Sequence, residues 1–236
     1  MNYDAAKMPH QIVLLPGLDG TDVLFRPVIE QLSLPATPLA YPQRLPTAYE
    51  DLLPLVLDAL PTEAGFTLLG WSFSGPLALM AAATNPPGLR GVILCASFVQ
   101  KPVFYLPAAV RHLARPLLFR FFARASRTKA LVGGYGSPAL DQLLAEAHGQ
   151  VPPDVMAARV RATLTVDVRS ELADCTVPIL YLAATRDFVV PRTNLRRIQR
   201  QRADVTTRLI DGPHLALATN PRDSARAIEE FCDTIA

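Results

Sequence analysis

Hydrophobic residues along the chain form short continuous runs, separated by segments in which they recur at helical spacing. Strands that are covered on both faces have continuous apolar runs rather than alternating ones. The runs predict parallel strands at residues 12–15, 66–69, 92–95 and 179–183, and more weakly at 37–41 and 205–210. Helical spacing predicts helices at residues 22–32, 49–60, 74–84, 193–201 and 223–235. This alternation predicts an α/β fold with a mostly parallel sheet of about six strands flanked by helices.

One long segment interrupts this alternation. Residues 97–170 contain no convincing strand, and their apolar spacing predicts helices near residues 106–122, 138–148 and 153–165. A crossover between neighbouring strands needs far fewer residues. We therefore predict that residues 1–96 and 171–236 form the core of the protein, and that residues 97–170 form an inserted helical cap. The abundance of Leu, Phe and Ala in this segment argues against a flexible linker.

A candidate nucleophile lies between the strand at 66–69 and the alanine-rich helix that follows. The sequence Gly70-Trp71-Ser72-Phe73-Ser74 resembles the G-x-S-x-G nucleophile elbow of the α/β-hydrolase fold, with Ser74 in place of the last glycine. A sharp strand-to-helix turn exposes its middle residue in front of the positive N-terminus of the helix. This favours Ser72, because Ser74 would have Ser72 and Pro76 at its flanks.

A nucleophilic serine needs a base, and the base needs an acid to hold it. Asp187 comes just after a strongly predicted strand, and His214 comes just after the last one. Because the carboxyl ends of parallel strands share one edge of a sheet, we expect Ser72, Asp187 and His214 to meet there. Their order along the chain is that of the α/β-hydrolase fold. Asp204 and Asp211 are less well placed, although Asp187 would also suit a simple helix cap.

An oxyanion hole requires two N–H groups directed at the developing negative charge. One would come from Phe73, the residue after the nucleophile. The other would come from the loop after the first strand, where Gly17 permits a close backbone approach and the N–H of Leu18 is the candidate. An ordinary glycine turn would fit the same loop residues.

Taken together, these motifs make the chain similar to α/β hydrolases over nearly its whole length. In layout it resembles small bacterial carboxylesterases, including the pimeloyl-acyl-carrier-protein methyl ester esterases, and the stretch LTVDVRSELADCTVPILYL adds to the likeness. The resemblance implies a serine esterase that forms an acyl-enzyme and needs no cofactor or metal. Thioesterases, lactonases, acyltransferases and carbon–carbon bond hydrolases share these residues. A non-catalytic ligand receptor on the same scaffold is the alternative from another class.

The first part of the cap, up to residue 140, carries positive charge without negative charge. No Asp or Glu occurs between Ala64 and Leu140, whereas arginines and aromatic residues alternate there. The apolar residues would roof a pocket for an acyl chain. The basic residues would dock an acidic partner such as an acyl carrier protein or a coenzyme A thioester, with Arg111, Arg115 and Arg124 as candidates. Arginines that merely solvate a helix face, or that lie on a membrane surface, fit the same pattern.

Composition limits the remaining classes. A formal net charge of +2 calls for no nucleic-acid partner, and 50% hydrophobic residues indicate a well-filled core. The three cysteines, Cys95, Cys175 and Cys232, are too far apart for a zinc motif or a disulfide framework. No apolar run approaches the ~20 residues of a membrane span. We therefore predict a cytoplasmic protein with a small-molecule ester substrate and no stable membrane insertion.

Overall fold

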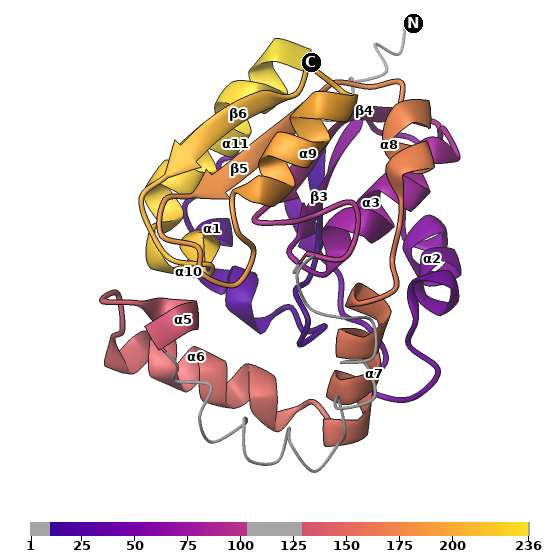
Figure 1. Ribbon diagram of the computed structural model, residues 1–236. Helices are drawn as coiled ribbons and strands as arrows, with labels where there is room; N and C mark the ends of the chain where they lie inside the picture. The colour runs from indigo at the N-terminus through magenta and orange to yellow at the C-terminus, as the bar shows by residue number, and fades with distance from the viewer. Residues whose placement is uncertain (1–9, 103–128, 236) are drawn as a thin grey trace, which may run out of the picture.

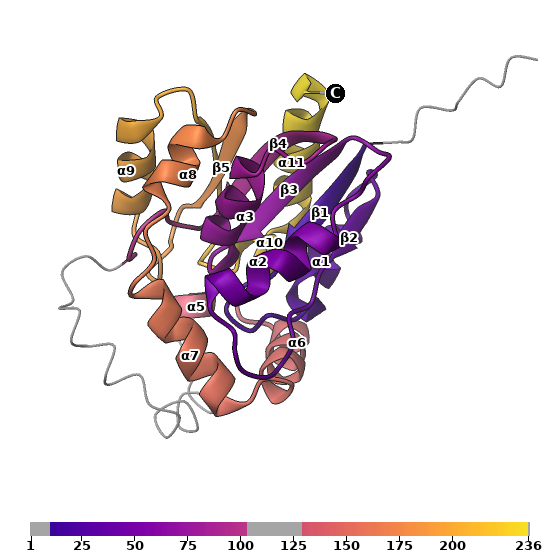
Figure 2. The same ribbon diagram turned by 90° about the vertical axis from the view of Figure 1, so that its right-hand side faces the viewer.

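The computed structural model describes residues 10–102 and 129–235 of the chain. Its centre is a six-stranded sheet in the order β2-β1-β3-β4-β5-β6, and every neighbouring pair of strands is parallel. Helices cover both faces (Figures 1 and 2), as the sequence predicted. The strands are β1 (Gln11–Leu15), β2 (Ala36–Pro38), β3 (Phe66–Trp71), β4 (Leu89–Cys95), β5 (Ile179–Ala184) and β6 (Thr206–Ile210).

Helices occupy the connections between the strands. Within the described ranges, none of them is long and apolar enough to cross a lipid bilayer. They are the 3₁₀ helix η1 (Val23–Phe25) and the α-helices α1 (Arg26–Ile29), α2 (Tyr49–Asp58), α3 (Ser74–Ala83), α5 (Lys129–Val132), α6 (Pro138–Gly149), α7 (Pro153–Thr163), α8 (Arg169–Asp174), α9 (Thr193–Gln201), α10 (Ala216–Thr219) and α11 (Pro221–Ile235).

Several elements differ from their predicted extents. The helix predicted at residues 22–32 is instead η1 followed by α1, because Pro27 has no N–H with which to continue the first helix. The strand predicted at residues 37–41 is the shorter β2, which ends at Pro38. The short helices α5, α8 and α10 were not predicted. The helix predicted near residues 106–122 lies outside the described residues.

Alternate residues of the central strands face two separate hydrophobic layers. On one face, Leu14 of β1 and Leu69 of β3 belong to a buried cluster with Phe231 of α11. On the other face, Leu68 of β3 belongs to a second cluster with Leu77 of α3. Because both faces are covered, the central strands have the continuous apolar sequences from which they were predicted.

The segment between β4 and β5 leaves the sheet and returns to it at one place. Gln100 and Asp167 form an isolated antiparallel bridge, and the N–H of Val168 donates to the carbonyl oxygen of Val99 at 2.8 Å. Between these two points the chain carries α5, α6 and α7, which lie beyond the carboxyl ends of the strands (Figure 1). The division of the chain into a core and a cap stays a prediction, and residues 101–166 are called the insert below.

The close packing of α11 on β4 gives the first testable prediction. A Cβ on Gly91 would lie 2.5 Å from Ile235 Cδ1 and 2.9 Å from Phe231 Cε1. We expect Gly91→Val to lower the free energy of unfolding by about 1–3 kcal/mol, measured by urea denaturation, because the core is overpacked. Gly136→Val is the control, since no described atom lies within 4 Å of a Cβ at that position. Equal stability of the two variants would contradict close packing at Gly91.

Candidate active site

The turn between β3 and α3 holds Ser72 in a strained conformation. Its φ of 51° lies in the left-handed region that non-glycine residues rarely adopt. The turn is so tight that a Cβ on Gly70 would lie 2.4 Å from the carbonyl oxygen of Ser74, which explains the glycine at that position. The N–H of Ser72 donates to the carbonyl oxygen of Cys95 at 2.8 Å, so the turn is tied to the neighbouring strand.

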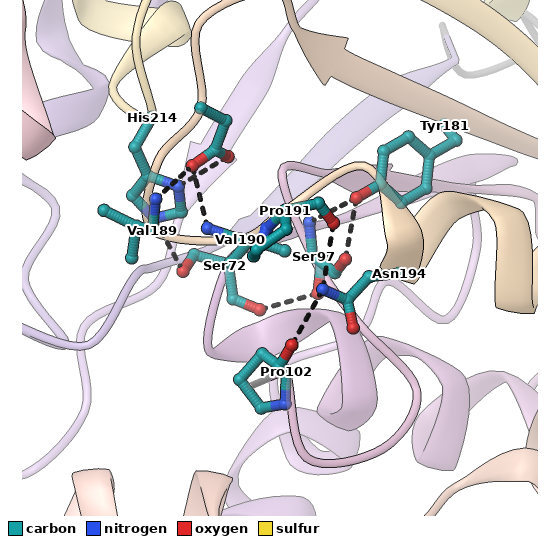
Figure 3. A network of polar contacts seen from close by, with 10 residues as sticks. Ser72, Ser97, Pro102, Tyr181, Val189, Val190, Pro191, Asn194 and His214 are labelled. Atoms are coloured by element: carbon teal, nitrogen blue, oxygen red, sulfur yellow. Dashed lines mark hydrogen bonds and ion pairs between the residues drawn. The ribbon is translucent and has the colours of Figure 1, made fainter. Parts of the chain in front are cut away.

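Ser72, His214 and Asp187 form a chain of hydrogen bonds at the carboxyl edge of the sheet. Figure 3 labels Ser72 and His214. His214 Nε2 lies 2.9 Å from Ser72 Oγ, and His214 Nδ1 lies 2.8 Å from Asp187 Oδ2. The other oxygen of Asp187 accepts the N–H groups of Val189 and Val190, each at 2.8 Å. An ionised carboxylate can only accept, so Nδ1 carries the proton and Nε2 is free to accept the hydroxyl proton of Ser72.

The His214 and Asp187 side chains are shielded from water. Only 6% and 3% of their surfaces are exposed, respectively, whereas Ser72 is half-buried. Hydrogen bonds between charged or polar groups are stronger where water is excluded. The geometry therefore suits transfer of a proton from an accessible hydroxyl to a fixed imidazole.

The loop after β1 and the turn that holds Ser72 each carry one of the two predicted oxyanion donors. β1 pairs with β3 so that Leu15 is opposite Gly70, which brings the loop after β1 beside the turn that holds Ser72. Chain order reverses between these two strands, where α/β sheets bind their ligands. Among the described residues, no acceptor is present for the N–H of Leu18 or of Phe73.

Ser74, which replaces the usual glycine, has its own set of partners. Its side chain is fully buried, and its hydroxyl donates to the carbonyl oxygen of Pro16. Tyr41 Oη lies 2.6 Å from Ser74 Oγ. Because the single proton of Ser74 goes to Pro16, Tyr41 must be the donor in that bond. Burial raises the pKa of Tyr41, so it keeps this proton. Ser74 therefore joins the elbow to the loop after β1.

Ser97 and Tyr181 form a second buried hydrogen-bond network that holds the turn. Ser97 Oγ donates to the carbonyl oxygen of Ser72 at 2.6 Å, and Tyr181 Oη donates to the carbonyl oxygen of Ser97 at 2.7 Å (Figure 3). A Cβ on Gly75 would lie 1.8 Å from Ser97 Oγ, so only glycine leaves room for this contact. Sequence analysis did not identify Ser97 or Tyr181, because an isolated serine and a strand tyrosine carry no local signal.

The rival acids lie elsewhere. Asp211 is exposed and accepts hydrogen bonds from Tyr135 and Thr185, at 2.7 Å and 2.8 Å. Asp204 is exposed and pairs with Arg202 at 3.1 Å. Neither contacts His214, as expected from their positions in the sequence. The predicted docking residues Arg111, Arg115 and Arg124 lie outside the described residues.

A parallel sheet with a serine on a strand-to-helix turn, followed by an aspartate and a histidine after later strands, is the arrangement of an α/β hydrolase. The chain belongs to the alpha/beta hydrolase family, whose model matches residues 12–227.

The relatives named here align along most of this chain. A pimeloyl-[acyl-carrier protein] methyl ester esterase of Xylella fastidiosa (strain 9a5c) is 25% identical over an alignment of 250 positions, which covers 95% of each protein. The biotin biosynthesis bifunctional protein BioHC of Cellvibrio japonicus (strain Ueda107) is 26% identical over 97% of this chain, which spans only 43% of that protein. The crystal structure of a bromoperoxidase from Bacillus anthracis shares the fold, with a TM-score of 0.81, 16% identity and coverage of 96% of this chain and 92% of that chain.

The Ser74 contacts predict a cost for removing its hydroxyl. Ser74→Ala leaves the buried carbonyl of Pro16 without this donor and the hydroxyl of Tyr41 without this acceptor. We expect the free energy of unfolding to fall by about 1–3 kcal/mol in urea denaturation. Ser170→Ala is the control, because its hydroxyl is exposed and bonds only Glu171 among the described residues. If both variants are equally stable, the Ser74 hydroxyl does not tie the two loops together.

Proposed function

We propose that this protein is a serine esterase that cleaves a carboxylic ester through an acyl-enzyme intermediate, with Ser72, His214 and Asp187 as its catalytic triad. The observation that carries the proposal is the pair of hydrogen bonds on His214, at 2.9 Å to Ser72 Oγ and 2.8 Å to Asp187 Oδ2. These separations fall within the range needed between a nucleophile, its base and the group that orients the base.

In the first half of the reaction, Ser72 Oγ attacks the carbonyl carbon of the ester as His214 Nε2 takes the hydroxyl proton. The carbonyl oxygen becomes an oxyanion, which the N–H groups of Leu18 and Phe73 stabilise. His214 then gives its proton to the leaving alcohol as the carbon–oxygen bond breaks, and the acyl group stays on Ser72. Asp187 holds the imidazole in the required tautomer and stabilises its positive form.

In the second half, water replaces the alcohol. His214 takes a proton from the water as its oxygen attacks the acyl carbon, and the same two N–H groups stabilise the second oxyanion. Collapse of this intermediate returns the proton to Ser72 and releases the carboxylic acid. The proposed reaction uses groups of the protein and no cofactor or metal. All three cysteines are buried and free, which agrees with a reducing compartment such as the cytoplasm.

Replacing the nucleophile gives the direct test. We expect Ser72→Ala to lower kcat for p-nitrophenyl esters by a factor on the order of 10⁴ or more, because no other group forms the acyl-enzyme. The assay compares esters from acetate to dodecanoate, and the preferred length measures the acyl pocket. Ser170→Ala, which removes an exposed hydroxyl, should retain wild-type activity. Equal activity of Ser72→Ala and wild type would rule out Ser72 as the nucleophile.

The rival proposal, a ligand receptor on the same scaffold, makes the opposite prediction. A receptor would bind an ester tightly and release it intact, with at most a slow single turnover. A folded wild-type protein that hydrolysed none of these esters, nor a carrier-linked one, would favour the receptor.

We further propose that the natural ester is carried on an acyl carrier protein. Two observations support this substrate. The Xylella fastidiosa relative, which aligns over 95% of the chain, is a pimeloyl-[acyl-carrier protein] methyl ester esterase. In addition, residues 64–140 contain eight Lys and Arg but no Asp or Glu, a composition suited to an acidic partner.

Charge reversal in the insert tests the carrier proposal. We expect Arg111→Glu, Arg115→Glu and Arg124→Glu together to raise KM for a carrier-linked methyl ester while sparing p-nitrophenyl butyrate, because repulsion affects only the acidic substrate. The matched control reverses three exposed arginines outside the insert, Arg196, Arg200 and Arg222. If the insert variant loses both activities equally, or neither, these arginines are not a docking surface.

A further inference from the structure

Arg159 in α7 is a buried cation with an unusual environment. None of its surface is exposed, although arginines are rarely buried without a charged partner. Among the residues that the structure describes, no carboxylate oxygen forms an ion pair with it. Its guanidinium is instead surrounded by neutral oxygen atoms. Burying a charge with only neutral partners costs free energy. The groups that bind the Arg159 guanidinium therefore indicate what this residue does.

The partners of Arg159 belong to two loops at the carboxyl edge of the sheet. Its Nη1 atom donates to the carbonyl oxygens of Leu18 and Asp19, at 3.2 Å and 2.7 Å. Its Nη2 atom donates to the carbonyl oxygen of Pro42 at 3.2 Å, and its Nε atom donates to Thr47 Oγ1 at 3.0 Å. One side chain of the insert therefore holds the loop after β1 and the segment after β2 together.

Two hydrogen bonds, one from Gly20 and one from Arg159, fix the peptide groups on both sides of Leu18. The carbonyl oxygen of Gly17 accepts the N–H of Gly20 at 3.0 Å, which closes a turn. In a trans peptide the N–H points opposite to the carbonyl, so the Leu18 N–H is directed away from this turn. The carbonyl oxygen of Leu18 is held in turn by Arg159. The direction of the free Leu18 N–H thus depends on the turn from one side and on Arg159 from the other.

The loop is shaped to admit the guanidinium. Gly20 has a φ of +66°, and a Cβ there would lie 2.3 Å from Arg159 Nη1. The ring of Tyr41 lies against the guanidinium, with its centroid 5.7 Å from the central carbon. Burial lowers the pKa of Arg159 to about 10, while the carboxylate of Asp19 opposes this change, so the side chain is charged at neutral pH. The charge strengthens its bonds to the loop carbonyls.

We propose that Arg159 is a positioning residue for the reaction, which fixes the Leu18 N–H in the direction required to stabilise the oxyanion. The inference rests on the proposed function, because it assumes that this N–H contacts the oxyanion. It also couples the seating of α7 to the catalytic machinery. Among the described residues, the carbonyl oxygen of Leu18 has Arg159 as its only donor, whereas the carbonyl oxygen of Asp19 also accepts a hydrogen bond from Gln43 Nε2 at 3.0 Å. Arg159 itself touches neither substrate nor triad in this role.

A second contact between the insert and the core supplies the control. Arg26 of α1 forms a bidentate ion pair with Glu146 of α6, at 2.6 Å and 2.8 Å. This pair is about half exposed and reaches none of the residues near Ser72 among those described. Its loss removes one contact between the insert and α1 without touching the loop after β1. Arg26→Met therefore separates mechanical anchoring of the insert from positioning of Leu18.

The experiment compares wild type, Arg159→Met and Arg26→Met. The readouts are kcat and KM for p-nitrophenyl butyrate, the inhibition constant of an alkyl trifluoromethyl ketone, and the melting temperature. Such a ketone forms a tetrahedral adduct with the serine, and its oxygen occupies the oxyanion position. For Arg159→Met we expect kcat to fall about 10- to 100-fold with a much smaller change in KM. The inhibition constant should rise by the factor that kcat/KM loses, and Arg26→Met should retain both.

The failures of the two proposals are distinguishable. A lower melting temperature for Arg159→Met, with kcat and ketone affinity unchanged, would overturn the positioning role and leave the esterase proposal intact. If wild type neither hydrolyses the ester nor binds the ketone, the proposed function fails, and this inference fails with it. If Arg159→Met does not fold, Arg159→Lys replaces it, because one ammonium group cannot span the same acceptors. Wild-type kcat and ketone affinity in Arg159→Lys would then overturn the inference.

Discussion

The close approach of the backbone at Gly70 and Ser74 is the constraint on which the site depends. It forces Ser72 into a left-handed conformation, which costs on the order of 1–3 kcal/mol and persists only where surrounding contacts enforce it. Here the N–H of Ser72 is bound by Cys95, and its carbonyl by Ser97. In this strained conformation, Ser72 is half-buried and its hydroxyl lies within hydrogen-bond distance of His214.

The loop after β1 is also held by hydrogen bonds from side chains on other elements. Ser74 holds the carbonyl of Pro16 from the elbow side, and Arg159 holds the carbonyls of Leu18 and Asp19 from the insert side. The two donors lie on different helices, Ser74 on α3 and Arg159 on α7 (Figure 2). Such preorganisation means that the N–H donors need little rearrangement when charge develops.

Much of the fold and the site geometry was predictable from local signals. The six parallel strands follow from apolar runs, and Ser72, Asp187 and His214 were each identified from their positions after strands. The structure brings these three side chains together. Where the structure differs from the predicted elements, the cause is also local in the sequence. The helix predicted at residues 22–32 breaks at Pro27, and β2 is an edge strand that is too short for a clear apolar pattern.

The supporting residues could not be predicted, because their partners are distant in the sequence. Tyr181 and Ser97 are 84 positions apart, and Arg159 and Asp19 are 140 positions apart. Arg159 also lies in a helix whose other arginine, Arg161, gives it no distinguishing sequence context. Nothing in the period of α7 indicates that one of the two is fully buried, since arginines on helices usually face solvent.

The bridge between Gln100 and Asp167, with the bond between Val99 and Val168, places both ends of the insert side by side. Such a junction permits evolution to exchange the intervening helices for others of any length, since neither the sheet nor its register need move. Arg159 limits that freedom, because a replacement without an equivalent donor would leave the carbonyl oxygen of Leu18 without its donor among the described residues. The insert can thus vary in length and composition, provided that it keeps a hydrogen-bond donor at the position of Arg159.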